Sequence, residues 1–255
     1  MSGGAAVEIR LRGLRKAFGD KVVLDGLDLD VLEGESLVIL GGSGTGKSVL
    51  LKHMIGLLRP DAGTVEVDGV DLASLDGPGL TAFRRRFGMA FQEGALFDSM
   101  TVEQNVAFAL RRAKWARARI RERVAECLEM VHLEGSERKM PAELSGGMRR
   151  RVGFARAIAL EPRILLFDEP TTGLDPVIKA VIDELILELQ QRLNPTTVTI
   201  THDLASAFRI ADRVALLFRG RIVAAAPPEE FRALEDPRVQ QFIRGLPSGP
   251  LTEAS

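Results

Sequence analysis

The residues Gly41 to Ser48 read Gly-Gly-Ser-Gly-Thr-Gly-Lys-Ser and match the pattern G-x-x-x-x-G-K-[ST] in full. In such a loop the glycines let backbone N–H groups point at phosphate oxygens, and the helix that follows adds the positive end of its dipole. Lys47 would reach the β- and γ-phosphates of a nucleoside triphosphate, and the Ser48 hydroxyl would bind Mg²⁺. The pattern therefore predicts a phosphate-binding loop rather than an ordinary glycine-rich turn.

Two carboxylates follow an apolar run much further along the chain, at Ile164 to Glu169. Asp168, at the end of a predicted buried strand, is placed to hold Mg²⁺ directly or through water. Glu169 is placed to act as the general base, or to orient the water that attacks the γ-phosphate. Asp-Glu-Pro alone could be a turn or the start of a helix, but in combination with the P-loop it predicts ATP binding and hydrolysis.

The elements that position these residues alternate between strands and helices. Buried runs at 36–40, 87–91, 164–168, 197–201 and 214–218 and helical periodicity at 47–58 predict a largely parallel sheet. Alternating patterns at 7–14 and 22–31 predict an antiparallel β region, and helical patterns at 102–113, 117–132 and 145–160 predict a helical insertion. The expected fold is α/β, a P-loop NTPase (RecA-like) core with an antiparallel β subdomain and an inserted α-helical subdomain. The core is expected at 1–92 and 151–226, the helical subdomain at 93–150 and a tail at 227–255, with 246–255 poorly ordered.

Composition narrows the class of protein. The 255 residues are 45% hydrophobic with a formal net charge of −1, which predicts a sizeable core and no bulk attraction to nucleic acid. The runs Arg84–Arg86 and Arg149–Arg151 lack interleaved aromatic residues, so we expect solvated helix faces with carboxylate partners. Cys127 is the single cysteine, and neither a signal peptide nor an apolar run of about 20 residues is present. These features predict a soluble, cytosolic protein whose membrane role would need another subunit.

A third motif lies between the first two. Leu144-Ser145-Gly146-Gly147-Met148, followed by a basic helix, resembles the signature motif of ABC-transporter ATPase subunits, and the resemblance covers nearly all of residues 7 to 226. It implies a head-to-tail dimer with two ATP molecules and Mg²⁺ between the subunits. In that dimer Ser145, Gly146 and Gly147 of one chain close the γ-phosphate site of the other.

The resemblance also assigns residues that periodicity alone does not. Phe18 corresponds to the aromatic that stacks on adenine, Asp175 lies in the D-loop at the dimer interface, and His202 corresponds to the histidine that contacts the γ-phosphate. Gln92 corresponds to the glutamine that senses Mg²⁺ and the attacking water. The predicted catalytic residues are therefore Glu169, His202 and Gln92, and the predicted metal ligands are Ser48, Gln92 and Asp168. The predicted nucleotide-binding residues are Phe18, Gly41, Gly42, Ser43, Gly44, Thr45, Gly46, Lys47, Ser48, Val49, Ser145, Gly146, Gly147 and Asp175.

Within this family, the segment Gly94 to Val102 and the tail Asp236 to Gly245 look most like the Mla/Mce-type lipid-transport branch. That resemblance implies a permease, an Mce-domain lipid-binding protein, a STAS-domain regulator and a place on the cytoplasmic face of the inner membrane. An importer ATPase for a small polar solute, such as an amino acid or phosphate, has the same catalytic machinery and is the alternative. A third reading, a non-transport ABC protein acting on ribosomes or DNA, usually needs two ATPase modules or a long coiled coil, which this chain lacks.

Overall fold

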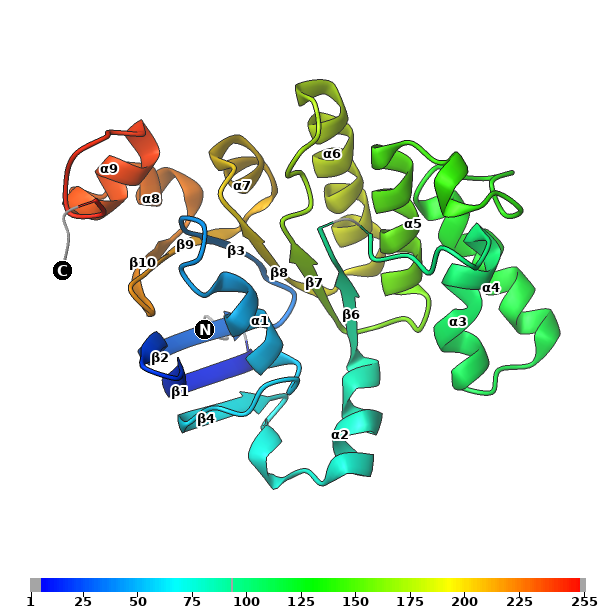
Figure 1. Cartoon of the computed structure of the whole chain (residues 1–255), viewed down its shortest axis with the longest axis horizontal. Coiled ribbons are helices and arrows are strands. Elements are labelled where there is room, and N and C mark those ends of the chain that lie inside the picture. The colour runs from blue at the N-terminus through cyan, green and yellow to red at the C-terminus, as the bar shows by residue number, and fades with distance from the viewer. Residues whose placement is uncertain (1–5, 93, 253–255) are drawn as a thin grey trace, which may run out of the picture. The chain divides into compact units, whose positions relative to one another are not determined.

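The computed structural model describes residues 6–92 and 94–252 (Figure 1). The chain forms two compact units, one made of Met1–Leu80 and Ile200–Ser255 and the other of Thr81–Thr199. The predicted start of the helical subdomain, residue 93, lies outside the described residues, as do residues 1–5 and 253–255. None of the helices in the described part combines the length and apolar character that crossing a bilayer requires.

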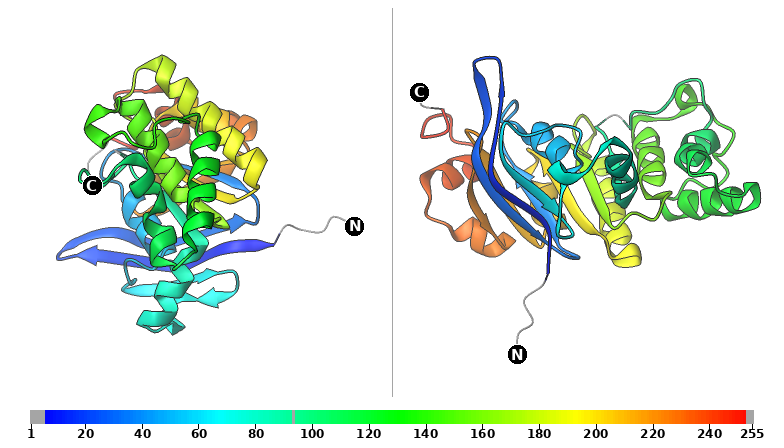
Figure 2. Two further views of the ribbon diagram at one scale, coloured as in Figure 1. Left: turned by 90° about the vertical axis from the view of Figure 1, so that its right-hand side faces the viewer. Right: turned by 90° about the horizontal axis from the view of Figure 1, so that it is seen from below.

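An antiparallel sheet in the first unit confirms the expected β region. Its strand order is β2-β1-β4-β5, and the long β1–β2 hairpin is the dark blue ribbon of Figure 2. The strands are β1 (Val7–Phe18), β2 (Lys21–Leu32), β4 (Ala62–Val67) and β5 (Val70–Asp71). One face is apolar, because Ile9, Leu11 and Leu14 of β1 are fully buried. This buried face holds the hairpin against the rest of the unit.

The P-loop in the same unit follows a strand that is buried along its whole length. Strand β3 (Ser36–Leu40) runs parallel to β9 (Arg213–Phe218), which pairs antiparallel with β10 (Arg221–Ala226). Helix α1 (Lys47–Met54) follows the loop and ends earlier than the predicted residue 58. Its end has a physical cause, because Gly56 adopts φ +65° and Leu57 N–H donates to the Lys52 carbonyl (2.8 Å).

The C-terminal part is more ordered than the sequence predicts. After α7 (Leu204–Ile210) and β10 come α8 (Pro228–Ala233) and α9 (Pro237–Arg244), which form the expected helical tail. The expectation of poor order from residue 246 onward is wrong for 246–252. The buried amide of Gln241 accepts from Leu251 N–H (2.7 Å) and donates to the Leu246 carbonyl (3.2 Å) and to Thr252 Oγ1 (3.2 Å). One buried side chain therefore ties this segment to α9.

The second unit contains the helices and the strand that carries the carboxylates. Strands β6 (Phe87–Ala90) and β7 (Ile164–Asp168) run parallel, as predicted. The helices are α3 (Val102–Arg112), α4 (Arg117–Met130), α5 (Gly146–Ile158) and α6 (Pro176–Leu193). Short elements complete the chain: η1 (Leu72–Ser74), α2 (Gly77–Phe83), η2 (Arg84–Arg86), η3 (Pro141–Glu143) and β8 (Thr196–Thr201), in which the chain returns to the first unit.

Helix α5 is the central element of the second unit. It lies directly on β6, since a Cβ on Gly88 would be 2.2 Å from the Ala157 carbonyl oxygen. Phe154 of α5 packs edge-to-face on Phe167 of β7, with ring centroids 5.0 Å apart. The carbonyls at the C-terminal end of α5 accept hydrogen bonds from the buried Arg123 of α4, at 3.0 Å for Ala159 and 2.8 Å for Ile158. The helix is thus held in place from both sides.

Candidate nucleotide-binding and hydrolysis site

The P-loop leads from β3 into α1 and surrounds its own lysine. Lys47 is 6% exposed, and its Nζ donates to the carbonyls of Gly41 (2.8 Å) and Gly42 (3.0 Å). Thr45 Oγ1 also donates to the Gly42 carbonyl (2.9 Å), which closes the loop. The first turn of α1 contains no acidic residue, and its N-cap makes no side-chain hydrogen bond. Together the ammonium group and the helix terminus provide a site for an anion such as a triphosphate.

Glycine is required at the two ends of this loop for different reasons. A Cβ on Gly41 would lie 2.8 Å from the Leu217 carbonyl oxygen and 2.9 Å from Thr45 Oγ1. Gly46 adopts φ +101°, and a Cβ there would be 2.8 Å from Val23 Cγ1 of β2. The loop can therefore follow this path only without side chains at these positions, which fits a cradle of backbone amides.

Phe18 is placed for contact with a flat ligand. It ends β1, and its side chain is 49% exposed, which is unusual for a phenylalanine. Lys16 lies over the ring with Nζ 5.6 Å from the centroid, and its ammonium pairs with Asp61 (2.7 Å). Asp61 also accepts from Ala17 N–H (2.7 Å), so the backbone before Phe18 is fixed. An exposed, oriented ring supports the predicted stacking role.

Asp168 ends β7, and Glu169 follows in a constrained turn. Ile164 to Phe167 are buried, whereas both carboxylates lie at the partly exposed end of the strand. Glu169 adopts φ +50°, a left-handed conformation that non-glycine residues seldom take. Its Oε2 accepts a hydrogen bond from Thr172 Oγ1 (2.8 Å), and its carbonyl accepts from Thr172 N–H (3.3 Å). The turn thus holds the glutamate side chain in one place.

The signature motif forms the beginning of α5. Ser145 is the N-cap, and its Oγ accepts from Met148 N–H (3.3 Å). Gly147 has a packing role that the sequence does not reveal, because a Cβ there would be 2.8 Å from Ile178 Cγ2 of α6. The glycines therefore serve the close approach of α5 to α6 in addition to leaving the helix N-terminus accessible.

The arginines after the signature differ from expectation. Arg150 is buried, and its guanidinium donates to the carbonyl of Pro170 (2.5 Å) and to that of Thr172. Arg149 donates to the Leu144 carbonyl (2.7 Å), and Arg151 to the His132 carbonyl (3.0 Å). The expectation of a solvated face with carboxylate partners is wrong for Arg150. Helical spacing offered a signal, since Arg150 is three residues after Gly147 and four before Phe154, both of which are buried.

The segment after Gln92 is also held by α5. Gln92 itself is exposed just beyond β6. Arg156 donates to the carbonyls of Gly94 and Ala95, both at 2.8 Å. A Cβ on Gly94, which has φ +75°, would lie 2.7 Å from the Arg149 carbonyl oxygen. The segment that is predicted to face a membrane subunit is thus anchored to the signature helix.

Asp175 and His202 lie at the starts of two other helices. Asp175 caps α6, and its Oδ1 accepts from the N–H groups of Val177 (3.0 Å) and Ile178 (3.1 Å). His202 is exposed directly after β8, and Asp203 next to it caps α7. The first unit thus carries Phe18, the P-loop and His202, whereas the second carries Gln92, the signature, Asp168, Glu169 and Asp175. The roles of these residues stay predictions that the geometry within each unit supports.

Comparison with known proteins identifies the family. Residues 24–172 match the ABC transporter family profile. The chain is an ABC transporter ATPase. It is 43% identical to the probable ribonucleotide transport ATP-binding protein mkl of Mycobacterium leprae, over 97% of this chain and 71% of that one. It is 41% identical to the intermembrane phospholipid transport system ATP-binding protein MlaF of Haemophilus influenzae, over 95% of this chain and 92% of that one. It is 42% identical to the sulfate/thiosulfate import ATP-binding protein CysA of Xylella fastidiosa, over 92% of this chain and 68% of that one.

Solved structures confirm the predicted P-loop NTPase fold of this ABC ATPase. The protein cbiO1 of Clostridium perfringens, part of the ABC transporter complex cbiONQ, superposes with a TM-score of 0.83 at 30% identity over 95% of this chain and 96% of that chain. A dimeric, post-hydrolysis structure of the cassette MJ0796 with ADP and phosphate has a TM-score of 0.78 at 33% identity over 86% and 98%. The predicted nucleotide, ATP, agrees with these relatives.

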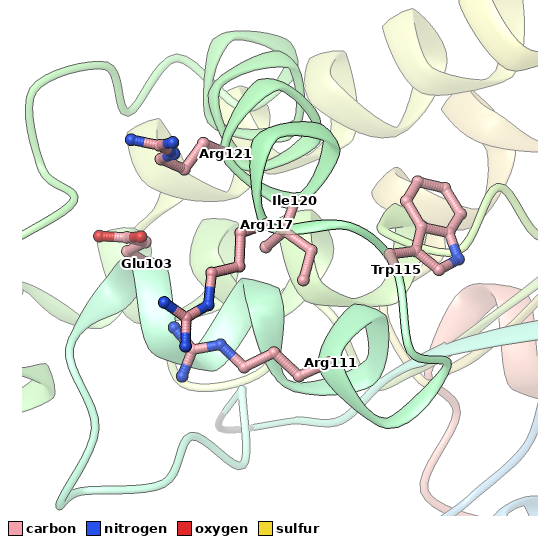
Figure 3. Close-up of a pocket in the computed structure, with 6 residues that line it drawn as sticks. All are labelled: Glu103, Arg111, Trp115, Arg117, Ile120 and Arg121. Carbon is pink, nitrogen blue, oxygen red and sulfur yellow. The ribbon is translucent and has the colours of Figure 1, made fainter.

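A separate pocket of about 650 Å³ lies in the helical part of the ABC ATPase. Figure 3 shows the guanidinium groups of Arg111, Arg117 and Arg121 on the same side as the Glu103 carboxylate, with Trp115 at the opposite side. None of the predicted nucleotide-binding or catalytic residues lines it. The pocket is therefore distinct from the P-loop, and the proposed chemistry does not use it.

His53 of α1 predicts an acid sensitivity for this ABC ATPase. His53 is fully buried, and Nδ1 must carry a proton because it donates to the Val49 carbonyl (2.8 Å). Burial lowers the pKa of His53 from its ordinary value of 6.5. Between the folded and unfolded pKa values the unfolded chain binds more protons at His53, so the contribution of this group to stability is fully present above pH 6.5 and is lost as the pH falls through the lowered pKa.

We expect thermal melts from pH 7.5 to 5.5 to show this loss, and His53→Leu to reduce the slope even if it lowers the melting temperature throughout. His132→Gln is the matched control, because the His132 side chain is 55% exposed and pairs with Glu188. If the melting temperature of His53→Leu fell as steeply with acid as that of the wild type, the effect would belong to other titratable groups.

Proposed function

We propose that Lys47, Ser48, Asp168 and Glu169 carry out ATP hydrolysis. The buried Lys47 ammonium binds the β- and γ-phosphates among the loop amides. Ser48, Asp168 and Gln92 offer hydroxyl, carboxylate and amide oxygens, which are the donors that Mg²⁺ prefers. When bound, Mg²⁺ would neutralise charge on the β- and γ-phosphates. Glu169, oriented by Thr172, accepts the proton of the attacking water, and Gln92 and His202 contact the water and the γ-phosphate.

We also propose that two copies of the chain close around two ATP molecules. The signature end of α5 would bind the γ-phosphate held by the partner's P-loop. Support comes from the dimeric MJ0796 cassettes. It also comes from exposed apolar side chains on α6 near Asp175, with Val177 71% and Val181 43% exposed. These surfaces fit a contact that forms on ATP binding and opens after hydrolysis.

Ser145→Arg tests this dimer. The new side chain would place bulk and charge at the exposed N-terminus of α5, so we expect ATP-dependent dimerisation to disappear while ATP binding by the monomer stays within about threefold. Size-exclusion chromatography with light scattering and a nucleotide titration measure the two quantities. Ser99→Arg, at an exposed serine elsewhere in the same unit, is the control. Dimers that persist in Ser145→Arg would exclude the composite site.

We further propose that the ATPase energises lipid transport between membranes. The observation that carries this proposal is the match to MlaF, which covers 92% of that protein at 41% identity. The expected partners are a multispanning permease, an Mce-domain lipid-binding protein and a STAS-domain regulator, with the ATPase on the cytoplasmic face of the inner membrane. The segment Gly94 to Val102, whose first two carbonyls accept from Arg156, would receive the permease. An importer of a small polar solute is the second candidate, because CysA is similarly related at 42%.

Co-purification separates these candidates. Tagged Glu169→Gln chain is isolated from native membranes with ATP and Mg²⁺, which should hold the complex closed. A permease with an Mce-domain protein and bound phospholipid is the expected result. A permease with a solute-binding protein would assign the chain to uptake, and ribosomal or DNA-bound proteins would exclude transport.

A further inference from the structure

Arg150 connects the signature helix to the turn that holds Glu169. Its guanidinium is buried, and it donates to the carbonyls of Pro170 and Thr172, the first and third residues after the glutamate. Buried arginines need full hydrogen-bonding partners, and the planar fork can bind two carbonyls at once. Because both acceptors belong to one short turn, the guanidinium fixes the orientation of that turn relative to α5.

Thr172 passes this constraint on to the carboxylate. Its carbonyl accepts from Arg150, and its hydroxyl donates to Glu169 Oε2 (2.8 Å). The left-handed backbone of Glu169 makes the side-chain direction depend on this turn. The hydrogen-bonded path from α5 to the glutamate therefore has a single intervening residue.

Other contacts keep α5 close to the same stretch of chain. The site of a Cβ on Gly147 lies 2.8 Å from Ile178 Cγ2, and that on Gly146 lies 3.7 Å from Leu174 Cδ2. The neighbouring arginines point elsewhere, since Arg149 donates to Leu144 and Arg151 to Val131 and His132. Among Arg149, Arg150 and Arg151, Arg150 is the one with described hydrogen bonds to the turn Glu169 to Thr172, which we call the catalytic turn.

We propose that Arg150 and Thr172 are positioning residues for ATP hydrolysis, with Arg150 holding the turn against α5 and Thr172 orienting the Glu169 carboxylate toward the attacking water. This inference rests on the proposed role of Glu169 as the base. Its consequence is that the signature helix controls the geometry of the base in its own chain. A shift of α5 would then change the turnover rate without changing nucleotide affinity.

Thr172 offers the sharper test, because its side chain is partly exposed and small changes there should be tolerated. Thr172→Val removes the hydroxyl at nearly constant volume, whereas Thr172→Ser keeps it. In the full-length chain we expect Thr172→Val to lower kcat about tenfold, the dissociation constant for ATP to stay within about twofold, and Thr172→Ser to restore most of kcat. A Thr172→Val chain with wild-type kcat, or a Thr172→Ser chain as slow as Thr172→Val, would overturn the role of the hydroxyl.

Arg150→Lys and Arg150→Met test the other half of the link. We expect both to lower kcat at least about tenfold, with Lys less severe, and with ATP affinity retained. Arg151→Met is the matched control, because it also removes arginine bonds from α5 to backbone carbonyls but none to the catalytic turn. An equal loss of kcat in Arg151→Met would show that Arg150 acts only through general packing of the helix.

Glu169→Gln separates failure of this inference from failure of the proposed function. Should Glu169→Gln retain normal turnover, the proposed function itself fails. Should Glu169→Gln be inactive while the Thr172 and Arg150 variants are normal, only this inference fails.

Discussion

Glu169→Gln is expected to lower the rate of ATP hydrolysis at least about 100-fold, because the amide cannot accept the proton of the attacking water. The Thr172 hydroxyl can still donate to the amide oxygen, so the turn should keep its shape. ATP binding should therefore survive, and the ATP-bound dimer should accumulate. Phosphate release measures the first effect, and light scattering with ATP and Mg²⁺ measures the second.

The control for this substitution is Glu129→Gln, which changes an exposed glutamate of α4 in the same unit and should leave turnover unchanged. Near wild-type hydrolysis in Glu169→Gln would remove the residue from the role of base. Loss of nucleotide binding in the same variant would show instead that the turn had collapsed.

Lys47→Ala is expected to weaken ATP binding about 10- to 100-fold, since charge-assisted hydrogen bonds to phosphate contribute roughly 1.5–3 kcal/mol. The substitution also removes the Nζ bonds to the Gly41 and Gly42 carbonyls, so the loop loses its internal brace. Lys47→Arg keeps the charge but not the compact ammonium group, so its ATP affinity should lie between those of the wild type and Lys47→Ala. A titration with a fluorescent ATP analogue measures the affinities.

Lys52→Ala provides the comparison on the same helix. Lys52 lies in the last turn of α1 and is exposed, so its removal should leave affinity within about twofold. Equal weakening in both variants would indicate a general electrostatic effect. Unchanged affinity in Lys47→Ala would exclude the lysine from the phosphate site.

The P-loop and the signature start are the parts most directly predictable from sequence. In both, the decisive interactions are local: Lys47 bonds carbonyls five and six residues away, and Ser145 accepts from the N–H of Met148 three residues on. The strand Ser36–Leu40 before the loop is likewise buried along its length, with an apolar run from Leu37 to Leu40. Local backbone geometry and hydrophobic pattern therefore sufficed to predict these two segments and the elements that carry them.

Some features depended on contacts between distant segments. The run Arg149–Arg151 looks uniform in composition, yet only packing decides that Arg150 is buried and bonds carbonyls 20 and 22 residues away. The return of residues 246–252 onto Gln241 likewise depends on packing, whereas α1 ends early through the local backbone of Gly56 and the Leu57 N–H bond to the Lys52 carbonyl. Burial and hydrogen-bond satisfaction are properties of the packed chain, and they override local pattern.

The sequence by itself determined which chemistry the chain can perform, because the P-loop, the paired carboxylates and the signature each encode their function in residue types at short range. The tertiary structure alone decided how Glu169 is oriented. Its hydroxyl donor, Thr172, is held by Arg150 of α5. These two residues are 22 positions apart in the chain, so their hydrogen bond exists only once α5 and the turn are packed together.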